Sequence, residues 1–186
     1  FYMPVFESAA MIPPQTRREA LTEVRAQLDT VSGSILNIRV GGNDLSHAFG
    51  LRRPANRTIY DLRPVADILI DIVAAFGTQY VVSGPVWEYY SGEGWEEGLR
   101  REMELDLLNG FTGKTVIHPN QIPVVNEMLR VSQRDYADAR AILNWDTGSG
   151  SLVSASEDGG RMNEYNTHSR WARRIVLRAE RYGVRA

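Results

Sequence analysis

Short apolar runs and longer segments with helical spacing alternate along the first 130 or so residues of the chain. The short runs, at 2–6, 35–40, 80–83 and 115–117, predict four β-strands. Each is followed by a predicted helix: one opening on a capping-box pattern at 16–19 and ending near Gly33, then 64–76, 95–108 and 122–129. Four strands that alternate with helices predict an α/β fold with a parallel sheet, as in a barrel or a doubly wound domain.

The last third of the chain has a different pattern. Ser132 is a predicted N-cap for a helix that ends near Trp145, and the Gly- and Ser-rich segment 146–160 is typical of a flexible connector. A terminal helix over 169–182 carries apolar residues on one face. We therefore divide the chain into an α/β domain over 1–145, a linker over 146–160 and a helical tail over 161–186.

Composition and charge narrow the classes of function. The chain has 186 residues, of which 43% are hydrophobic and 24% charged, as in globular proteins. Lys and Arg number 21 against 23 Asp and Glu, so the charge indicates neither a nucleic-acid partner nor a membrane surface. The longest apolar stretch, 65–76, contains two aspartates, and no signal peptide is evident. With no cysteine, the chain has no disulfide, and we expect a cytoplasmic protein that binds small molecules or other chains.

Three familiar motifs are excluded by their context. Gly113-Lys114-Thr115 lacks the glycine that a phosphate-binding loop needs five positions earlier, and it leads into a predicted strand. Gly148-Ser149-Gly150 lies in the predicted connector and not at a strand-to-helix turn, so it is not a nucleophile elbow. The three histidines are too widely spaced to indicate a zinc site.

Two carboxylates occupy the positions where parallel strand-helix folds place their chemistry. Glu7 follows the first predicted strand, and Asp44 closes the glycine-rich turn after the second. Adjacent strands lie about 4.8 Å apart, so both carboxylates can reach one cation, and oxygen ligands favour Mg²⁺ or Mn²⁺. The alternative is structural: Asp44 caps its loop and Glu7 pairs with an arginine.

Four ordered segments resemble the citrate lyase beta subunit and HpcH/HpaI aldolase family. They are Phe6-Glu7-Ser8-Ala9, Gly41-Gly42-Asn43-Asp44-Leu45, the long segment from Gly113-Lys114-Thr115 through His118-Pro119 to Glu127, and Gly160-Arg161-Met162-Asn163-Glu164. The third is the most specific of the four. Trp171-Ala172-Arg173-Arg174-Ile175 continues the similarity in the tail.

This resemblance implies a (β/α)8 barrel in which Glu7 and Asp44 bind Mg²⁺, and the metal chelates a 2-oxo acid. The amides of Gly42, Asn43 and Asp44 would bind the substrate carboxylate. Glu164 occupies the position of a tail carboxylate that acts as an acid or base over a neighbouring active site in several relatives, so we expect a homo-oligomer. The implied activity is that of a carbon-carbon bond lyase, with a 2-oxo acid or an acyl thioester as substrate.

Several features depart from the family pattern. Asn43 stands where many members have an acidic residue, and the loop 85–95 is unusually aromatic and acidic for the coenzyme A-dependent members. Only four strand-helix units are predicted, whereas a barrel has eight, so we interpret the chain as the C-terminal half of a TIM barrel with a helical tail. We expect this fragment to be inactive alone. Two alternatives stay open: a noncatalytic half-barrel module, and a thioester hydrolase or malate-synthase-like enzyme on the same metal site.

Overall fold

The chain forms two compact units, Phe1–Met128 and Leu129–Ala186. The computed structural model describes residues 1–145, 153–156 and 159–185. The unit boundary lies before residue 145, because the helix that follows Ser132 packs against the tail helix and not within the α/β unit. Of the proposed linker, 146–152 and 157–158 lie outside the described residues, and Val153–Ala155 forms a short strand, β6.

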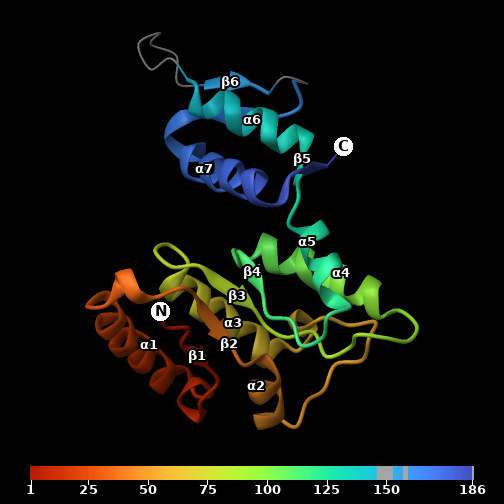
Figure 1. Cartoon of the computed structure of the whole chain (residues 1–186). Coiled ribbons are helices and arrows are strands. Elements are labelled where there is room, and N and C mark those ends of the chain that lie inside the picture. The colour runs from red at the N-terminus through yellow and green to blue at the C-terminus, as the bar shows by residue number, and fades with distance from the viewer. Residues whose placement is uncertain (146–152, 157–158, 186) are drawn as a thin grey trace. The chain divides into compact units, whose positions relative to one another are not determined.

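A parallel four-stranded sheet organises the first unit (Figure 1). Its strands are β1 (Val5–Phe6), β2 (Ile38–Val40), β3 (Val82–Gly84) and β4 (Gly113–Lys114), and they lie in the order β1-β2-β3-β4. Every neighbouring pair is parallel. The predicted α/β fold with a parallel sheet is therefore confirmed, and all four strand ends that precede a helix meet at the same edge of the sheet.

Helices connect the strands. The α-helices are α1 (Pro14–Asp29), α2 (Gly42–Ala48), α3 (Arg63–Phe76), α4 (Trp95–Leu108) and α5 (Gln121–Met128), and short 3-10 turns are η1 (Ala9–Met11), η2 (Ser32–Ser34) and η3 (Ile59–Asp61). The predicted bounds of α3 and α4 agree with the structure to within one residue.

The two faces of the sheet differ in their surroundings. Phe6, Ile38, Val40 and Val82 point to one face and join a buried apolar core with residues of α1 and α3. Val5, paired in register with Arg39, points to the opposite face. Val5 is 44% exposed there. Val81 lies on the same face, two residues before Ser83, which pairs with Arg39, and is 48% exposed. The helices thus cover one face, as the outer ring of helices does in a TIM barrel.

Three local predictions were wrong. Helix α1 begins at Pro14 and not at a capping box, because the Thr16 hydroxyl donates to the carbonyls of Ala10 and Pro13. Residues 42–48, where the sequence indicated a glycine-rich turn and a loop around Asp44, form α2. The fourth strand is 113–114 instead of 115–117: the last ladder bond runs from the Thr115 N–H to the Gly84 carbonyl, and β3 is then followed by Pro85, which has no N–H to continue the pairing.

The second unit is a helical hairpin of α6 (Gln133–Leu143) and α7 (Tyr165–Tyr182). Ser132 caps α6 as predicted, since its hydroxyl accepts from the Asp135 N–H at 3.0 Å. Two small sheets complete the unit: β5 (Val131–Ser132) pairs with β8 (Val184–Arg185), and β6 pairs with β7 (Met162–Glu164). Among the described residues, no helix has the length and hydropathy needed to cross a membrane.

Candidate functional site

The carboxylates of Glu7 and Asp44 converge beside Gly41. Glu7 directly follows β1, Asp44 lies in the first turn of α2, and the Gly41 N–H extends the sheet by donating to the Phe6 carbonyl at 3.1 Å. A Cβ built on Gly41 would lie 2.3 Å from Glu7 Oε2 and 3.2 Å from Asp44 Oδ2. Both oxygens therefore border the same small space, which stays open because residue 41 has no side chain.

Position 41 requires glycine because a side chain would not fit there, and not because its backbone conformation is unusual. Its φ of −84° is open to any residue. Both carboxylate side chains are exposed, so water or a substrate has access to the oxygens. The alternative in which Glu7 pairs with an arginine has no support, because the ion pairs found in the described residues do not include Glu7.

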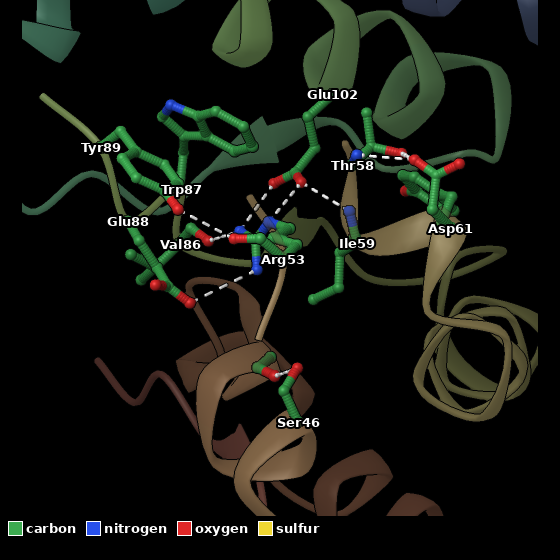
Figure 2. Close-up of polar contacts among 12 residues, drawn as sticks. Ser46, Arg53, Thr58, Ile59, Asp61, Val86, Trp87, Glu88, Tyr89 and Glu102 are labelled. Atoms are coloured by element: carbon green, nitrogen blue, oxygen red, sulfur yellow. Dashed lines mark hydrogen bonds and ion pairs between the residues drawn. The ribbon is translucent and has the colours of Figure 1, made fainter. Parts of the chain in front are cut away.

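The start of α2 is held by close packing on Gly42. A Cβ there would lie 2.6 Å from Ile59 Cδ1 and 2.6 Å from Pro85 Cβ, so η3 and the loop after β3 both press on this residue. Within α2, the buried Ser46 hydroxyl donates to the Gly42 carbonyl at 2.7 Å (Figure 2). The amides of Gly42, Asn43 and Asp44 belong to the first helical turn, where N–H groups have no partner within the helix.

Behind these contacts lies a buried network of charges. Glu102 of α4 is fully buried and accepts hydrogen bonds from the Ile59 N–H at 2.8 Å and from Lys114 Nζ at 2.8 Å, and its Oε2 lies 3.0 Å from Arg53 Nε. Arg53 also donates to the Val86 carbonyl and lies over the Trp87 ring. Figure 2 shows Arg53 between Glu102 and the loop after β3, where it donates to the Val86 carbonyl.

Lys114 is the centre of the other half of this network. Its ammonium bonds Glu102 and Asp106, each at 2.8 Å, and Asp106 accepts from the Tyr60 hydroxyl at 2.7 Å. The two carboxylates raise the pKa of Lys114 against the effect of burial, and burial raises the pKa of Asp106. A lysine held protonated in this way is not a nucleophile, so its role is structural. In the motif Gly113-Lys114-Thr115, which was excluded as a phosphate-binding loop, Lys114 thus lies on β4 and bonds two carboxylates of α4.

A capping box stabilises η3, the 3-10 turn whose Ile59 packs on Gly42. The Thr58 N–H donates to Asp61 Oδ2 at 2.7 Å, and the two residues form a capping box around η3 (Figure 2). The hydrogen bond from the Thr58 N–H lowers the pKa of Asp61. Ile59 is therefore held from both sides, by this cap and by Glu102.

The loops after β3 and β4 are joined by aromatic and amide contacts. The rings of Tyr90 and His118 stack with centroids 4.3 Å apart and planes 12° apart. The buried Gln121 donates to the carbonyls of Trp87 and Tyr89, both at 2.8 Å, and accepts from the Ile117 N–H at 2.9 Å. The aromatic loop noted in the sequence is thus anchored to the His118-Pro119 segment.

Glu164 lies in the second unit, at the end of β7, as the N-cap residue of α7. Its N–H donates to His168 Nδ1 at 3.0 Å, and its side chain is half-buried. The segment before it is firmly held: Asp138, which is buried, accepts from Arg161 at 2.6 Å and from Asn163 at 3.0 Å. Glu164 therefore belongs to a different unit from Glu7 and Asp44.

The donor set at Gly41 fits a hard cation that keeps open positions. Among the residues for which coordinates are described, no group of three or more His, Asp or Glu side chains forms a metal site. Two exposed carboxylates that share one space are nevertheless the kind of partial donor set that Mg²⁺ uses when water and substrate fill its other positions. The residues present therefore suit Mg²⁺ better than zinc, which takes three or four protein ligands.

Parts of the chain are similar to proteins of known sequence or structure. A stretch of 74 residues is 38% identical to L-malyl-CoA/beta-methylmalyl-CoA lyase of Cereibacter sphaeroides, and it covers 39% of this chain and 22% of that protein. The protein CitE of Mycobacterium tuberculosis, solved in complex with magnesium, acetoacetate and coenzyme A, is 26% identical with a TM-score of 0.58. That match covers 78% of this chain and 52% of the CitE chain.

A citrate lyase from Burkholderia xenovorans shares the fold with a TM-score of 0.66 at 18% identity, over 98% of this chain and 53% of that one. The chain thus spans about half the length of these solved relatives, and the matched segment spans about a fifth of the curated one. Residues 1–184 match the family model described as C-C_Bond_Lyase of the TIM-Barrel fold. The resemblance found in the sequence is confirmed, and the chain belongs to this family of carbon-carbon bond lyases.

Proposed function

We propose that this chain provides the metal-binding part of a Mg²⁺-dependent carbon-carbon bond lyase that acts on a 2-oxo acid adduct. The observation that carries the proposal is the convergence of Glu7 and Asp44 on one space beside Gly41, at the ends of adjacent parallel strands. In a parallel strand-helix fold this edge of the sheet carries the chemistry. Family membership supplies the reaction class.

In this proposal the residues have separate roles. Glu7 and Asp44 hold Mg²⁺, which when bound supplies positive charge for the oxygen that becomes negative as the bond breaks. The N–H groups of Gly42, Asn43 and Asp44 donate to the substrate carboxylate, and Glu164 exchanges a proton with the substrate of a neighbouring subunit. The packing of Ile59 and Pro85 on Gly42 keeps the first turn of α2 in place. Glu102 and Arg53 keep Ile59 and Val86 in place in turn.

The comparisons also support a second substrate class. One relative is an L-malyl-CoA/beta-methylmalyl-CoA lyase, and CitE was solved in complex with coenzyme A. An acyl thioester is therefore the alternative to a free 2-oxo acid as substrate. The loop from Pro85 to Gly94 carries two glutamates and no lysine or arginine, and the nearby Arg52 and Arg53 pair with Glu88, which disfavours the phosphates of coenzyme A at that loop. We therefore place the free 2-oxo acid first.

Metal binding gives the most direct test. Replacing Glu7 with glutamine or Asp44 with asparagine should weaken Mn²⁺ binding to the chain by about tenfold or more, since even groups that only orient a ligand contribute 10 to 100-fold. The measurement is a Mn²⁺ titration followed by electron paramagnetic resonance, with Mg²⁺ as competitor. Glu19→Gln, at an exposed position on α1, is the matched control and should bind like the unchanged chain. Equal Mn²⁺ affinity in the unchanged chain and in all three variants would contradict the proposed metal site.

We also propose that the four strands are half of an eight-stranded barrel, joined in homo-oligomers. The apolar side chains on the uncovered sheet face and the match to about half of the solved relatives support this. The chain alone should then release no measurable pyruvate from a 4-hydroxy-2-oxo acid with Mg²⁺, because groups on the missing wall each contribute factors of about 100 to 1000. Addition of the other four strands in trans should restore release. Turnover by the chain alone that does not depend on Glu7 would contradict both proposals.

A further inference from the structure

The sheet face opposite the apolar core carries a positive charge. Arg39 is the middle residue of β2, and the register places it beside Val5 of β1 and Ser83 of β3. Its side chain is half-buried on this face. The Arg39 N–H donates to the Pro4 carbonyl at 2.9 Å, but its guanidinium has no hydrogen bond or ion pair with any residue that the structure describes. A carboxylate is therefore needed to compensate this charge when the face is covered.

Other groups on this face also lack their complement. Val5 and Val81 are 44% and 48% exposed. Asn37, two residues before Arg39, donates to Ser83 Oγ at 2.9 Å, while its own Oδ1 is buried and accepts no hydrogen bond from the described residues. Sheets in which all strands are parallel occur almost only where both faces are covered, and β1 and β4 each pair on one side only. These features indicate a surface on which further strands dock.

A second copy of this chain does not supply the missing carboxylate. In a barrel closed by two copies, the two β2 strands would lie opposite each other, and interior layers take their side chains from alternate strands. Both Arg39 side chains would then enter one layer. The residues in register with Arg39, which are Val5, Ser83 and Gly113, include no acid. The two carboxylates of the proposed metal site lie nearer the strand ends and bind the ion. Two uncompensated guanidinium groups in one interior layer therefore oppose closure by a second copy.

We propose that this face docks a different half-barrel, one with four parallel strands and an aspartate or glutamate in the interior layer of Arg39. The inference rests on the half-barrel part of the proposed function. The partner's carboxylate and the Arg39 guanidinium form an ion pair across the barrel interior, one layer below the proposed metal site. The charge of Arg39 thus selects an acidic partner half over a second copy. Complete barrels still join into homo-oligomers through their outer surfaces.

A charge-reversed copy of the chain serves as a partner half with the required acid. Arg39→Glu places a carboxylate in the layer where a closed barrel brings it opposite Arg39 of the unchanged chain. In sedimentation velocity with Mg²⁺, an equimolar mixture of the two proteins should associate at least about 30-fold more tightly than either protein associates with itself. Arg39→Met loses the charge without gaining an acid, so it should self-associate more tightly than the unchanged chain.

The matched control is Arg63→Glu, which reverses a charge on the outer surface, where the arginine side chain is 84% exposed, and should not strengthen association in the mixture. Thermal unfolding shows that each variant is folded; if Arg39→Glu is not, the comparison of Arg39→Met with the unchanged chain decides. A mixture no tighter than the unchanged chain alone, or Arg39→Met that self-associates no more tightly than it, would overturn the ion pair. Absence of association in every combination would overturn the docking face and the half-barrel. Mn²⁺ binding that depends on Glu7 would survive both results, so failure of the metal site is recognised separately.

Discussion

Replacing Lys114 with methionine should lower the thermal unfolding midpoint of the first unit by roughly 10 °C. Lys114 is completely buried and bonds two buried carboxylates, so its removal leaves Glu102 and Asp106 with too little compensating charge. Breaking such a buried pair from one side costs about 3 to 5 kcal/mol. The midpoint is measured by circular dichroism at neutral pH.

Two further variants make the Lys114 prediction specific. Arg63→Met removes an ion pair of similar length, 2.9 Å to Asp67, but on a surface where the arginine side chain is 84% exposed, and it should cost at most about 1 kcal/mol. The double change Lys114→Met with Asp106→Asn should be less destabilising than Lys114→Met alone, because it also removes an uncompensated carboxylate. If Lys114→Met costs no more than Arg63→Met, the network does not stabilise the unit.

The carboxylate pair could be predicted from the sequence because it depends on local pattern and on topology. Glu7 and Asp44 each follow an apolar run, and parallel strands place both ends at one edge of the sheet. The role of Gly41 depends on distances between segments that are far apart in the sequence. A sequence shows that a glycine is present, but not that a Cβ there would meet Glu7 at 2.3 Å.

The charge network left a weaker signal that the sequence analysis missed. Glu102 and Asp106 are four residues apart on α4, and the buried Leu99 and Met103 share that helix surface. Acidic residues on the buried face of a helix need a cation, so the pattern indicated a partner. It did not indicate that Lys114 was the partner, since 113–115 was interpreted as the approach to a strand. The apolar pair Val116 and Ile117 suggested that strand, yet Ile117 is 53% exposed in the structure.

The tail was predicted less well for a physical reason. The hydrophobic pattern identified α7 but placed its start four residues late, because 165–168 are mostly polar. In this first turn, His168 Nδ1 accepts from the Glu164 N–H at 3.0 Å. The short strands β5 to β8 pair over two or three residues each, so they carry too few positions for an alternating pattern. Strand β7 is held instead by tertiary contacts, since Asp138 of α6 accepts from Arg161 and Asn163.

Replacing Gly41 with alanine should weaken Mn²⁺ binding by at least about tenfold, as much as the loss of a residue that orients a ligand. The new Cβ would lie 2.5 Å from Glu7 Cβ as well as 2.3 Å from Glu7 Oε2, so rotation of the flexible carboxylate alone cannot relieve the clash. Either the Glu7 side chain moves away from Asp44, or β1 and β2 separate locally. Both movements destroy the shared space between the carboxylates.

The control for Gly41→Ala is Gly33→Ala, since a Cβ at Gly33 has no atom within 4 Å. That variant should bind Mn²⁺ like the unchanged chain. Adding Glu7→Gln to Gly41→Ala should cause little further loss, because the two changes act on the same ligand and such neighbours are not additive. Mn²⁺ affinity that survives Gly41→Ala would mean that the ion does not occupy the space beside Gly41, whereas a full second loss in the double variant would mean that Gly41 acts on some ligand other than Glu7.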